Sequence, residues 1–271
     1  MLLSAGEVKN TAIKKLFYFE LRNGLMQPLQ DLVLRHPKVF AAKGKLARGI
    51  NIKELRTGIL KNAANKPCGV IKRLLRDIAA AYARQLPKKH SGVEERFSRQ
   101  FNYPDKRRVK SAEDLPKLGI KTFFCSNVCA AYRREIYDSL GGFVQRAIFN
   151  EDMIYASAVI RNGYKIAYEA QAGVYHSHDY TNMQKLHRNF DLGVSQAEHP
   201  EVFADVPSES EGGKMVKAAA AYFKQQKKWY RLPHFYVQCA FKYAGYFLGK
   251  HYKKLPKSWI LRFTSNREYW K

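Results

Sequence analysis

The chain has 271 residues, of which 46% are hydrophobic, and this globular composition can bury a sizeable core. Its net charge of +25 favours anionic partners: nucleic acid, acidic lipid headgroups or phosphorylated substrates. The four cysteines are too few and too irregularly spaced for a disulfide framework, which indicates a reducing cytosol. We find no hydrophobic signal region and no run of about 18 apolar residues, so we expect a soluble or surface-bound protein.

Residues 1–77 are predicted to form a basic helical segment. Up to Arg76 the segment holds 16 Lys or Arg residues and 4 Asp or Glu residues, and its pattern predicts helices over 8–21, 28–34 and 52–62. It contains no strand followed by a glycine loop and a helix. Asp31 and Asp77 are isolated acids, because neither has a second acid two positions away.

The apolar run at 78–83 fits either a buried strand or the tail of a helix, and it ends before Pro87. Residues 88–119 are polar and basic, with three aromatic residues among arginines: Phe97, Phe101 and Tyr103. Such interleaving is found on surfaces that stack nucleic-acid bases, and it also fits an enzyme loop. Both interpretations stay open at this point.

A β-rich run at 120–124 predicts a strand that leads into Ser126 and Asn127. Small polar side chains at a strand end can line a pocket, or they can simply satisfy the amides of a turn. Cys125 and Cys129 have no second cysteine pair nearby, so a zinc site built with later histidines is disfavoured and buried thiols are expected.

An acid pair, Glu151-Asp152, follows a tight turn at Gly141-Gly142 and opens a helical pattern that runs to 161. Asn162-Gly163 is expected to end this helix. The acids then lie in the first helical turn, where the helix dipole favours carboxylates, so a purely structural role is the alternative to a catalytic one.

Two further strands are predicted at 166–168 and 173–175. The second delivers His176 and His178 to one face, because side chains alternate along a strand. Asp152 and His176 are 24 residues apart, which is enough for a helix, a turn and a returning strand. We therefore expect the acid and the histidines at one edge of a sheet.

The C-terminal third is predicted to be helical. A helix follows Thr181 and reaches Gly193, residues 199–213 form a linker, and a basic amphipathic helix covers 214–230. Pro233 separates it from an aromatic helix at 235–248, and cations at 250–257 precede further aromatic residues. Cations beside aromatic rings suit a helix in a lipid headgroup interface, and a helix pair packed on the sheet is the alternative.

Several of these motifs together resemble the acceptor half of family 2 glycosyltransferases, with the rhamnosyltransferase branch nearest. The resemblance covers about 78–271 and is carried by these segments: 99–104, 124–134, 141–143, 150–152, 163–165 and 174–178. It implies an α/β fold, namely a partial GT-A (Rossmann-like) glycosyltransferase core at 78–198. This core is flanked by the N-terminal helical segment 1–77 and by C-terminal amphipathic helices at 199–271.

The resemblance also implies roles for individual residues. Asp152, with Glu151, corresponds to the general base of the family, and His176 corresponds to a ligand of the Mg²⁺ or Mn²⁺ that holds the donor diphosphate. Substrate-binding positions are carried over onto Ser126, Asn127, Arg133, Gly141, Gly142 and His178. The implied donor is a nucleotide diphosphate sugar such as dTDP-rhamnose, and the implied acceptor is a lipid-linked or polysaccharide glycan of a bacterial surface.

The resemblance further implies a cytoplasmic protein held peripherally on the anionic inner face of the plasma membrane, with nucleic acid the least expected partner. The chain departs from the family pattern because no nucleotide-binding half with its Asp-x-Asp motif is recognisable. We therefore expect no metal-dependent transfer by this chain alone. A non-catalytic remnant, a partner subunit, or a basic nucleic-acid or membrane-surface binder are the alternatives.

Overall fold

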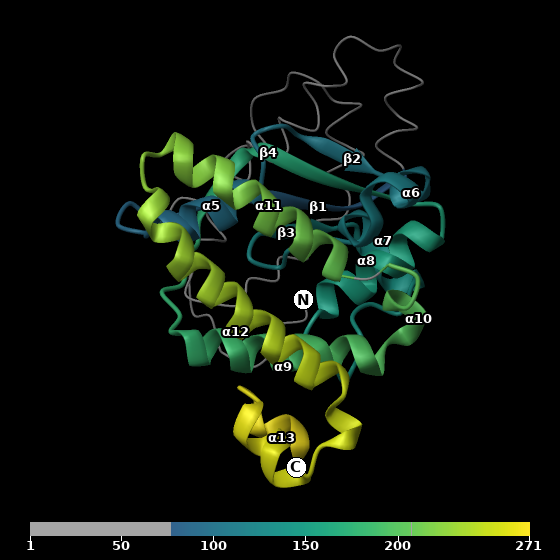
Figure 1. The fold of residues 1–271 in the computed structure, drawn as a ribbon. Helices are drawn as coiled ribbons and strands as arrows, with labels where there is room; N and C mark the ends of the chain where they lie inside the picture. The colour runs from purple at the N-terminus through teal and green to yellow at the C-terminus, as the bar shows by residue number, and fades with distance from the viewer. Residues whose placement is uncertain (1–76, 207) are drawn as a thin grey trace, which may run out of the picture.

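The structure is a computed structural model that describes residues 77–206 and 208–271. The helices predicted over 8–21, 28–34 and 52–62 lie outside the described residues. Within the described ranges the chain forms one mixed sheet surrounded by helices, which confirms the predicted α/β class (Figure 1).

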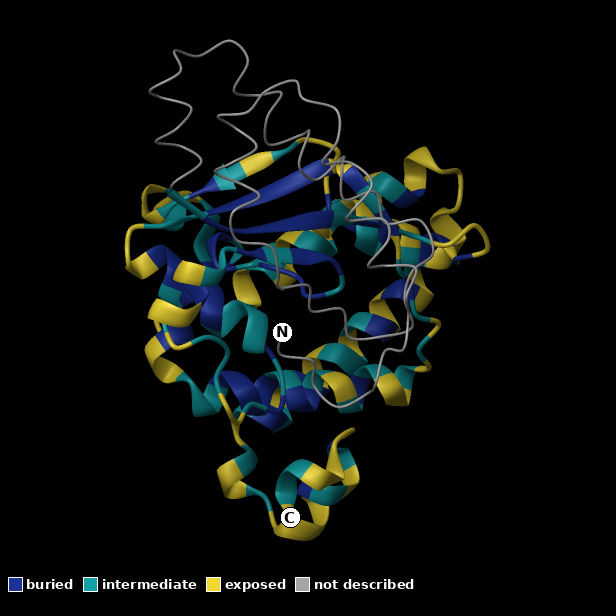
Figure 2. Cartoon of the chain, turned by 180° about the vertical axis from the view of Figure 1, so that it is seen from behind, coloured by how far each residue is buried: buried dark blue, intermediate teal, exposed yellow. Residues whose placement is uncertain are grey.

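The sheet has four strands in the order β2-β4-β1-β3. Their bounds are β1 Ile78–Leu86, β2 Arg108–Lys110, β3 Ala130–Tyr132 and β4 Lys165–Tyr175. The long central strands β1 and β4 run parallel, and the short outer strands pair with them antiparallel. Of the two interpretations of the apolar run at 78–83, the strand is therefore confirmed. The sequence at the start of β1 is a continuous apolar run because this central strand is covered on both faces, as the burial colours of Figure 2 show.

The two strands predicted at 166–168 and 173–175 are one strand, and this prediction was wrong. In β4, Glu169 pairs with Ala83 of β1, while Gly173 pairs with the next β1 residue, Arg84. The residues between form a bulge, which inserts extra residues without ending the strand. A Cβ on Gly173 would lie 2.9 Å from Leu86 Cδ1, so glycine permits the close approach at which pairing resumes.

The strand predicted at 120–124 is absent from the described structure, where the 3₁₀ helix η2 (Gly119–Thr122) and a turn take its place. Two more short helices precede it: η1 (Ala112–Asp114) and α6 (Leu115–Leu118). The buried Lys110 ammonium donates to the carbonyls of Lys121 and Phe124. A lysine from β2 thus satisfies backbone groups that a neighbouring strand would otherwise pair.

Helix α8 (Glu151–Arg161) covers one face of the two central strands, and its predicted bounds are confirmed. Tyr155, Val159 and Ile160 pack there with Tyr82 of β1 and Ile166 of β4. The helix ends at Asn162-Gly163, and Gly163 has the positive φ of 79° expected after a helix C-terminus. Short helix α7 (Arg134–Ser139) lies between β3 and α8 in the chain.

The linker predicted at 199–213 is wrong, because most of it is helical. Its helices are α10 (Pro200–Phe203) and the first turns of α11 (Glu209–Gln225). The helix predicted over 214–230 therefore begins and ends earlier. Pro233 lies in the first turn of α12 (Leu232–Lys250), where proline's missing N–H leaves no hydrogen bond unmade. The last elements are η3 (Trp229–Arg231), η4 (Tyr252–Lys254), α13 (Lys257–Phe263) and η5 (Arg267–Trp270).

Helices α9 (Asn182–Glu198) and α12 pack with their backbones in contact and run in the same direction. A Cβ on Gly245 would lie 2.1 Å from Leu186 O, and a Cβ on Gly249 would lie 2.1 Å from Phe190 O. Glycines four residues apart let two helices approach this closely. As a result the C-terminal half of α12 buries Gly245 and Gly249 against α9, while Tyr243 and Phe247 are exposed.

Helix α5 (Val93–Asn102) packs against α11 and α12 through a buried aromatic cluster. Phe97 is 4% exposed and its ring lies 5.4 Å from that of Phe235. Tyr103 is buried as well. The base-stacking interpretation is therefore wrong for Phe97 and Tyr103, because a buried ring cannot receive a nucleic-acid base.

Candidate active site at the carboxyl edge of the parallel strands

Strands β1 and β4 end side by side. Leu86 is paired with Tyr175, and the His176 N–H donates to the Leu86 carbonyl at 2.9 Å. In open α/β sheets, ligands bind outside the carboxyl ends of the parallel strands. This edge is therefore where the predicted site residues are expected to lie.

Asp152 reaches the edge from the first turn of α8. Its Oδ2 accepts from the Asn127 N–H at 3.2 Å, and its Oδ1 accepts from the Met153 N–H at 2.9 Å. Asn150 precedes the helix in the left-handed conformation, with φ 64°. This sharp entry places the acid at the helix start, where it faces the loop before β3.

The environment of Asp152 suits a general base. Burial, followed by the charge of Glu151, raises the pKa of the Asp152 carboxyl to about 6, and backbone N–H groups, those of Asn127, Met153 and Asp152 itself, only partly oppose this rise. A base is most effective when its pKa lies near the working pH. Asp152 is therefore largely ionised at pH 7 and still basic enough to accept a proton from a positioned hydroxyl.

Ser126 and Asn127 lie in the loop before β3, not at the end of a strand as predicted. The Ser126 hydroxyl accepts from Gln85 Nε2 at 2.6 Å, and Tyr132 donates its hydroxyl proton to Asn127 Oδ1. Both residues are buried. The structure thus brings Ser126, Asn127 and Asp152 together, with the end of β1 beside them.

Gln85 and Lys110 support this loop, and sequence reasoning did not single them out. The buried Gln85 accepts from Arg99 and donates to Ser126. Burial lowers the pKa of the Lys110 ammonium to about 7. The Lys110 Nζ atom lies over the ring of Tyr82, 5.0 Å from the ring centroid. A lysine at the end of the short strand β2 and a glutamine late in the alanine-rich strand β1 were the only local signals.

His176 and His178 face one another just beyond β4, as predicted. Their Nε2 atoms are 2.8 Å apart, and Tyr180 stacks on His178 with ring centroids 4.7 Å apart. Burial, the neighbouring His178 and then Arg99 are the main causes that lower the pKa of His176 to about 4. Burial also lowers the pKa of His178, with Arg188 the next cause. Both rings are therefore neutral at pH 7.

The described residues do not fit the divalent cation that the resemblance implies. Mg²⁺ and Mn²⁺ prefer oxygen ligands, whereas the charged groups that most affect His176 are cationic: Arg99, Arg188 and Lys88. In residues 77–206 and 208–271, no group of three or more His, Cys, Asp or Glu side chains could hold a metal ion. A metal at His176 would need ligands from outside these ranges.

Arg133 lies at the opposite end of the sheet. Its N–H donates to Ala79 O near the start of β1, about 23 Å from Leu86 at the usual rise per strand residue. Gly141 and Gly142 form the predicted turn, with φ of 77° and 67°. A Cβ on Gly142 would lie 2.7 Å from the Tyr137 ring, so the fold itself accounts for this glycine.

Two curated proteins match this chain. The O-antigen chain rhamnosyltransferase WbaN of Salmonella anatum is 39% identical over 196 residues, which is 72% of this chain and 62% of that protein. The O-antigen chain rhamnosyltransferase RfbN of Salmonella typhimurium is 41% identical over 194 residues, which is 71% of this chain and 62% of that protein.

No protein-family model and no solved structure matches the chain. The match spans less than two thirds of the length of either curated relative. Identities of 39% over 196 residues and 41% over 194 residues confirm the resemblance to rhamnosyltransferases that the motifs indicated. The matched part of this chain is thus homologous to O-antigen chain rhamnosyltransferases.

Proposed function

We propose that this chain takes part in transferring a deoxyhexose, rhamnose, from a nucleotide diphosphate sugar to a bacterial surface glycan of the O-antigen class. The observation that carries the proposal is Asp152, a carboxylate with a pKa of about 6 at the carboxyl edge of a chain homologous to rhamnosyltransferases. The proposed donor is dTDP-rhamnose, and the proposed acceptor is a lipid-linked or polymeric glycan.

The chemistry follows from the position of Asp152. Its carboxylate accepts the proton of an acceptor hydroxyl while the hydroxyl oxygen forms a bond to the anomeric carbon. The bond from that carbon to the diphosphate oxygen breaks, and the nucleoside diphosphate leaves with the electron pair. Attack opposite the leaving group inverts the anomeric centre. General-base assistance of this kind contributes about 10²–10⁴-fold.

The backbone N–H groups of Asn127 and Met153 orient the carboxylate. Gln85 and Lys110 hold the loop that carries Asn127. His176 would contribute one neutral nitrogen to a divalent-cation site only if the other ligands came from outside the described residues.

A chimera tests the assignment. Residues 77–271 of this chain replace the matching part of RfbN, and transfer of rhamnose from dTDP-rhamnose to a lipid-linked acceptor is measured by mass spectrometry. The chimera is expected to transfer rhamnose. The Asp152→Asn chimera is expected to lose about a hundredfold or more of the turnover with donor affinity little changed. Retention of more than about a tenth would remove Asp152 from the base role.

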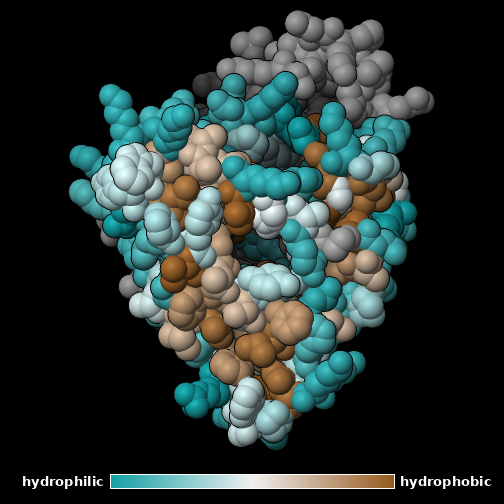
Figure 3. All heavy atoms as spheres, viewed as in Figure 1, coloured by the Kyte–Doolittle hydropathy of each residue, from teal (hydrophilic) through white to brown (hydrophobic). Residues whose placement is uncertain are grey.

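We further propose that the C-terminal helices hold the chain on an anionic membrane surface. None of the helices in the described ranges is long and apolar enough to span a bilayer. The outward face of α12 is aromatic or aliphatic, with these residues 40–61% exposed: Tyr236, Val237, Tyr243 and Phe247. Figure 3 shows hydrophobic residues gathered along the diagonal of this helix.

Cations flank this apolar face at both ends. Lys227, Lys228 and Arg231 precede it, and Lys253, Lys254 and Lys257 follow it, all of them exposed. Trp229 and Trp259, at 71% and 52% exposure, lie beyond its two ends. Rings at the lipid boundary with cations over anionic headgroups describe an interfacial helix, and each cation near such a surface contributes about 1 kcal/mol.

Vesicle sedimentation tests this surface. The chain is expected to sediment with vesicles of phosphatidylglycerol and phosphatidylcholine and to be released by high salt. The double variant Tyr243→Ser/Phe247→Ser is expected to bind several-fold more weakly, whereas Met183→Ser, an exposed apolar residue of α9, serves as the matched control. Equal binding to pure phosphatidylcholine would count against the proposal.

A further inference from the structure

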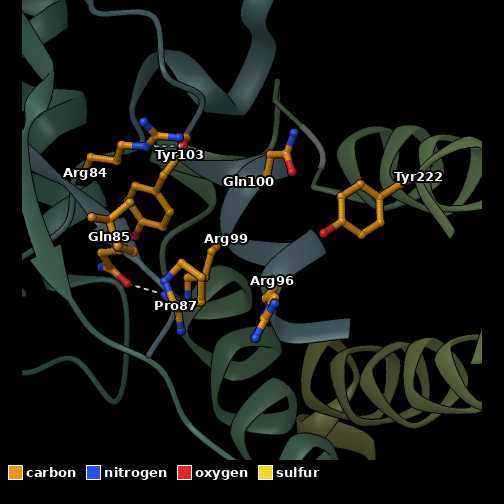
Figure 4. Close-up of a pocket in the computed structure, with 9 residues that line it drawn as sticks. Arg84, Gln85, Pro87, Arg96, Arg99, Gln100, Tyr103 and Tyr222 are labelled. Carbon is orange, nitrogen blue, oxygen red and sulfur yellow. Dashed lines mark hydrogen bonds between the residues drawn. The ribbon is translucent and has the colours of Figure 1, made fainter. Parts of the chain in front are cut away.

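A cavity of about 240 Å³ lies at the carboxyl edge, between the end of β1, helix α5 and helix α11. Three arginines line it, Arg84, Arg96 and Arg99, together with Gln85 and Tyr222, and no acidic side chain is among its lining residues. In Figure 4 the side chains of Arg96 and Arg99 extend from α5 in the same direction, and the Tyr222 hydroxyl points back toward α5.

The arginines are held in place by contacts that leave much of their donor capacity available. Arg96 donates from Nε to Ser91 O and from Nη2 to Lys89 O, and Arg84 donates from Nε to Tyr103 O. A guanidinium has five N–H donors. In the described part of the chain, these contacts leave the Nη1 group of Arg96 and both Nη groups of Arg84 for a ligand.

The charge of the cavity is also unbalanced. Glu95 pairs with Arg99 at 2.7 Å, whereas Arg84 and Arg96 have no acidic partner within the described residues. Two uncompensated guanidinium groups favour an anion with several oxygens, because arginine binds phosphate oxygens in pairs. A single carboxylate would use fewer of these donors than a diphosphate.

The size of the cavity limits the ligand. Pockets for whole drug-sized molecules measure about 300–1,000 Å³. At about 240 Å³, this cavity falls below that range and admits one polar group of a larger substrate, not a whole nucleotide sugar.

Gln85 connects the cavity to the candidate base. It lines the cavity, accepts from Arg99 and donates to Ser126, whose chain neighbour Asn127 donates to Asp152. A group bound by the arginines would therefore lie beside the loop that positions Asp152.

We propose that this arginine cavity binds the diphosphate group of a substrate directly, without a bridging metal ion. The ligand's identity rests on the proposed function, whereas the anion site rests on the cavity alone. Two substrates of the reaction carry a diphosphate: the nucleotide sugar donor and a lipid-linked acceptor.

Calorimetric titration of the 271-residue chain with inorganic pyrophosphate in EDTA tests the proposal. Binding is expected in the absence of metal and to weaken at least about tenfold in Arg96→Gln and in Arg84→Gln. Arg134→Gln is the matched control, because the side chain of this arginine is 40% exposed and pairs with Asp138 on α7, outside the cavity. Arg96→Lys retains the positive charge but cannot bind two oxygens in parallel, so its affinity for pyrophosphate is expected to lie between those of the wild type and Arg96→Gln. Unfolding midpoints verify that each variant folds.

Competition separates the two sources. Displacement of pyrophosphate by dTDP but not by farnesyl diphosphate would assign the cavity to the donor, and the reverse would assign it to the acceptor; both support a diphosphate site. The inference is overturned if pyrophosphate fails to bind, binds only with metal, or binds equally to wild type and both cavity variants. Pyrophosphate binding is measured without sugar transfer. A chimera that fails to transfer rhamnose would therefore contradict the proposed function but not this anion site.

Discussion

Polar side chains are usually exposed and apolar ones buried, and two regions of the molecule depart from this rule in opposite ways: the carboxyl edge of the sheet and the outer face of α12. At the edge, polar side chains are buried, including Gln85, Ser126 and Asn127. On α12, large apolar side chains such as Phe247 are exposed. Buried polar groups persist where hydrogen bonds satisfy them, and exposed apolar groups mark a surface that meets a partner. The buried polar groups at the carboxyl edge therefore indicate an active site, and the exposed apolar groups on α12 indicate the surface proposed to hold the chain on a membrane.

The largest effect is expected from truncating a buried ring of α12, and an exposed ring of the same helix provides the comparison. Phe235→Ala removes a ring that is 1% exposed and packs on Phe97, so the free energy of unfolding should fall by about 3–5 kcal/mol. Phe247→Ala removes a ring that is 51% exposed and should change it by less than about 0.5 kcal/mol. Urea unfolding of both variants checks the pair. Equal losses would mean that the face of α12 is covered within the chain.

Adding a methyl group between α9 and α12 should break the packing that turns the aromatic face outward. In Gly245→Ala the new Cβ meets Leu186 O, which is backbone and cannot move aside, so we expect a loss of about 2–3 kcal/mol. Gly212→Ala is the matched control, because this exposed position in α11 has nothing within 4 Å of an added Cβ. Thermal unfolding should show a gain of up to about 1 kcal/mol for the control.

Removing the buried lysine should loosen the carboxyl edge. Lys110→Met keeps the length of the side chain but leaves the carbonyls of Lys121 and Phe124 without their donor. The expected loss of unfolding free energy is about 2 kcal/mol, with faster amide exchange in residues 121–127. Lys106→Met, on an exposed lysine, is the control. Unchanged exchange in Lys110→Met would show that the loop holds its shape without this lysine.

The smallest expected effect concerns the charge on Asp152. Burial raises the pKa of this carboxyl in the folded state above its unfolded value, so ionisation above about pH 6 destabilises the fold. Asp152→Asn should therefore raise stability at pH 7, on the order of 1 kcal/mol after solvent screening, with the gain fading as the pH falls to about 4. Unfolding of wild type, Asp152→Asn and the exposed control Asp105→Asn at both pH values checks this. A gain that persists at pH 4 would have another origin.

The sequence predicted the parts of the site that lie in local motifs. The helix opened by Asp152 and the strand before His176 were recognisable because caps and side-chain alternation are local signals. Gln85, Lys110 and Arg96 were missed because their roles depend on partners distant in sequence or in other elements. No local rule places Gln85 beside Ser126, 41 residues away.

The incorrect element boundaries have equally specific causes. The bulge in β4 breaks the alternating pattern at 170–172 without ending the strand, so it resembles a turn in the sequence. The region 199–213 contains proline, glycine and serine, yet Pro200 opens α10 and the exposed glycines Gly212 and Gly213 lie inside α11. Proline is tolerated in a first helical turn, and the low helix propensity of two glycines does not end a helix that the rest of its sequence favours.

The titration of Asp152 tests the central claim most directly, because it needs neither donor nor acceptor. Carboxyl ¹³C resonances of the 271-residue chain, with Asp152→Asn used to assign the signal, report its ionisation as the pH is varied. We expect a midpoint at about pH 6, with Asp152 ionised and basic at pH 7. A midpoint at or below the ordinary aspartate value of about 4 would contradict a carboxylate buried at this edge as a general base.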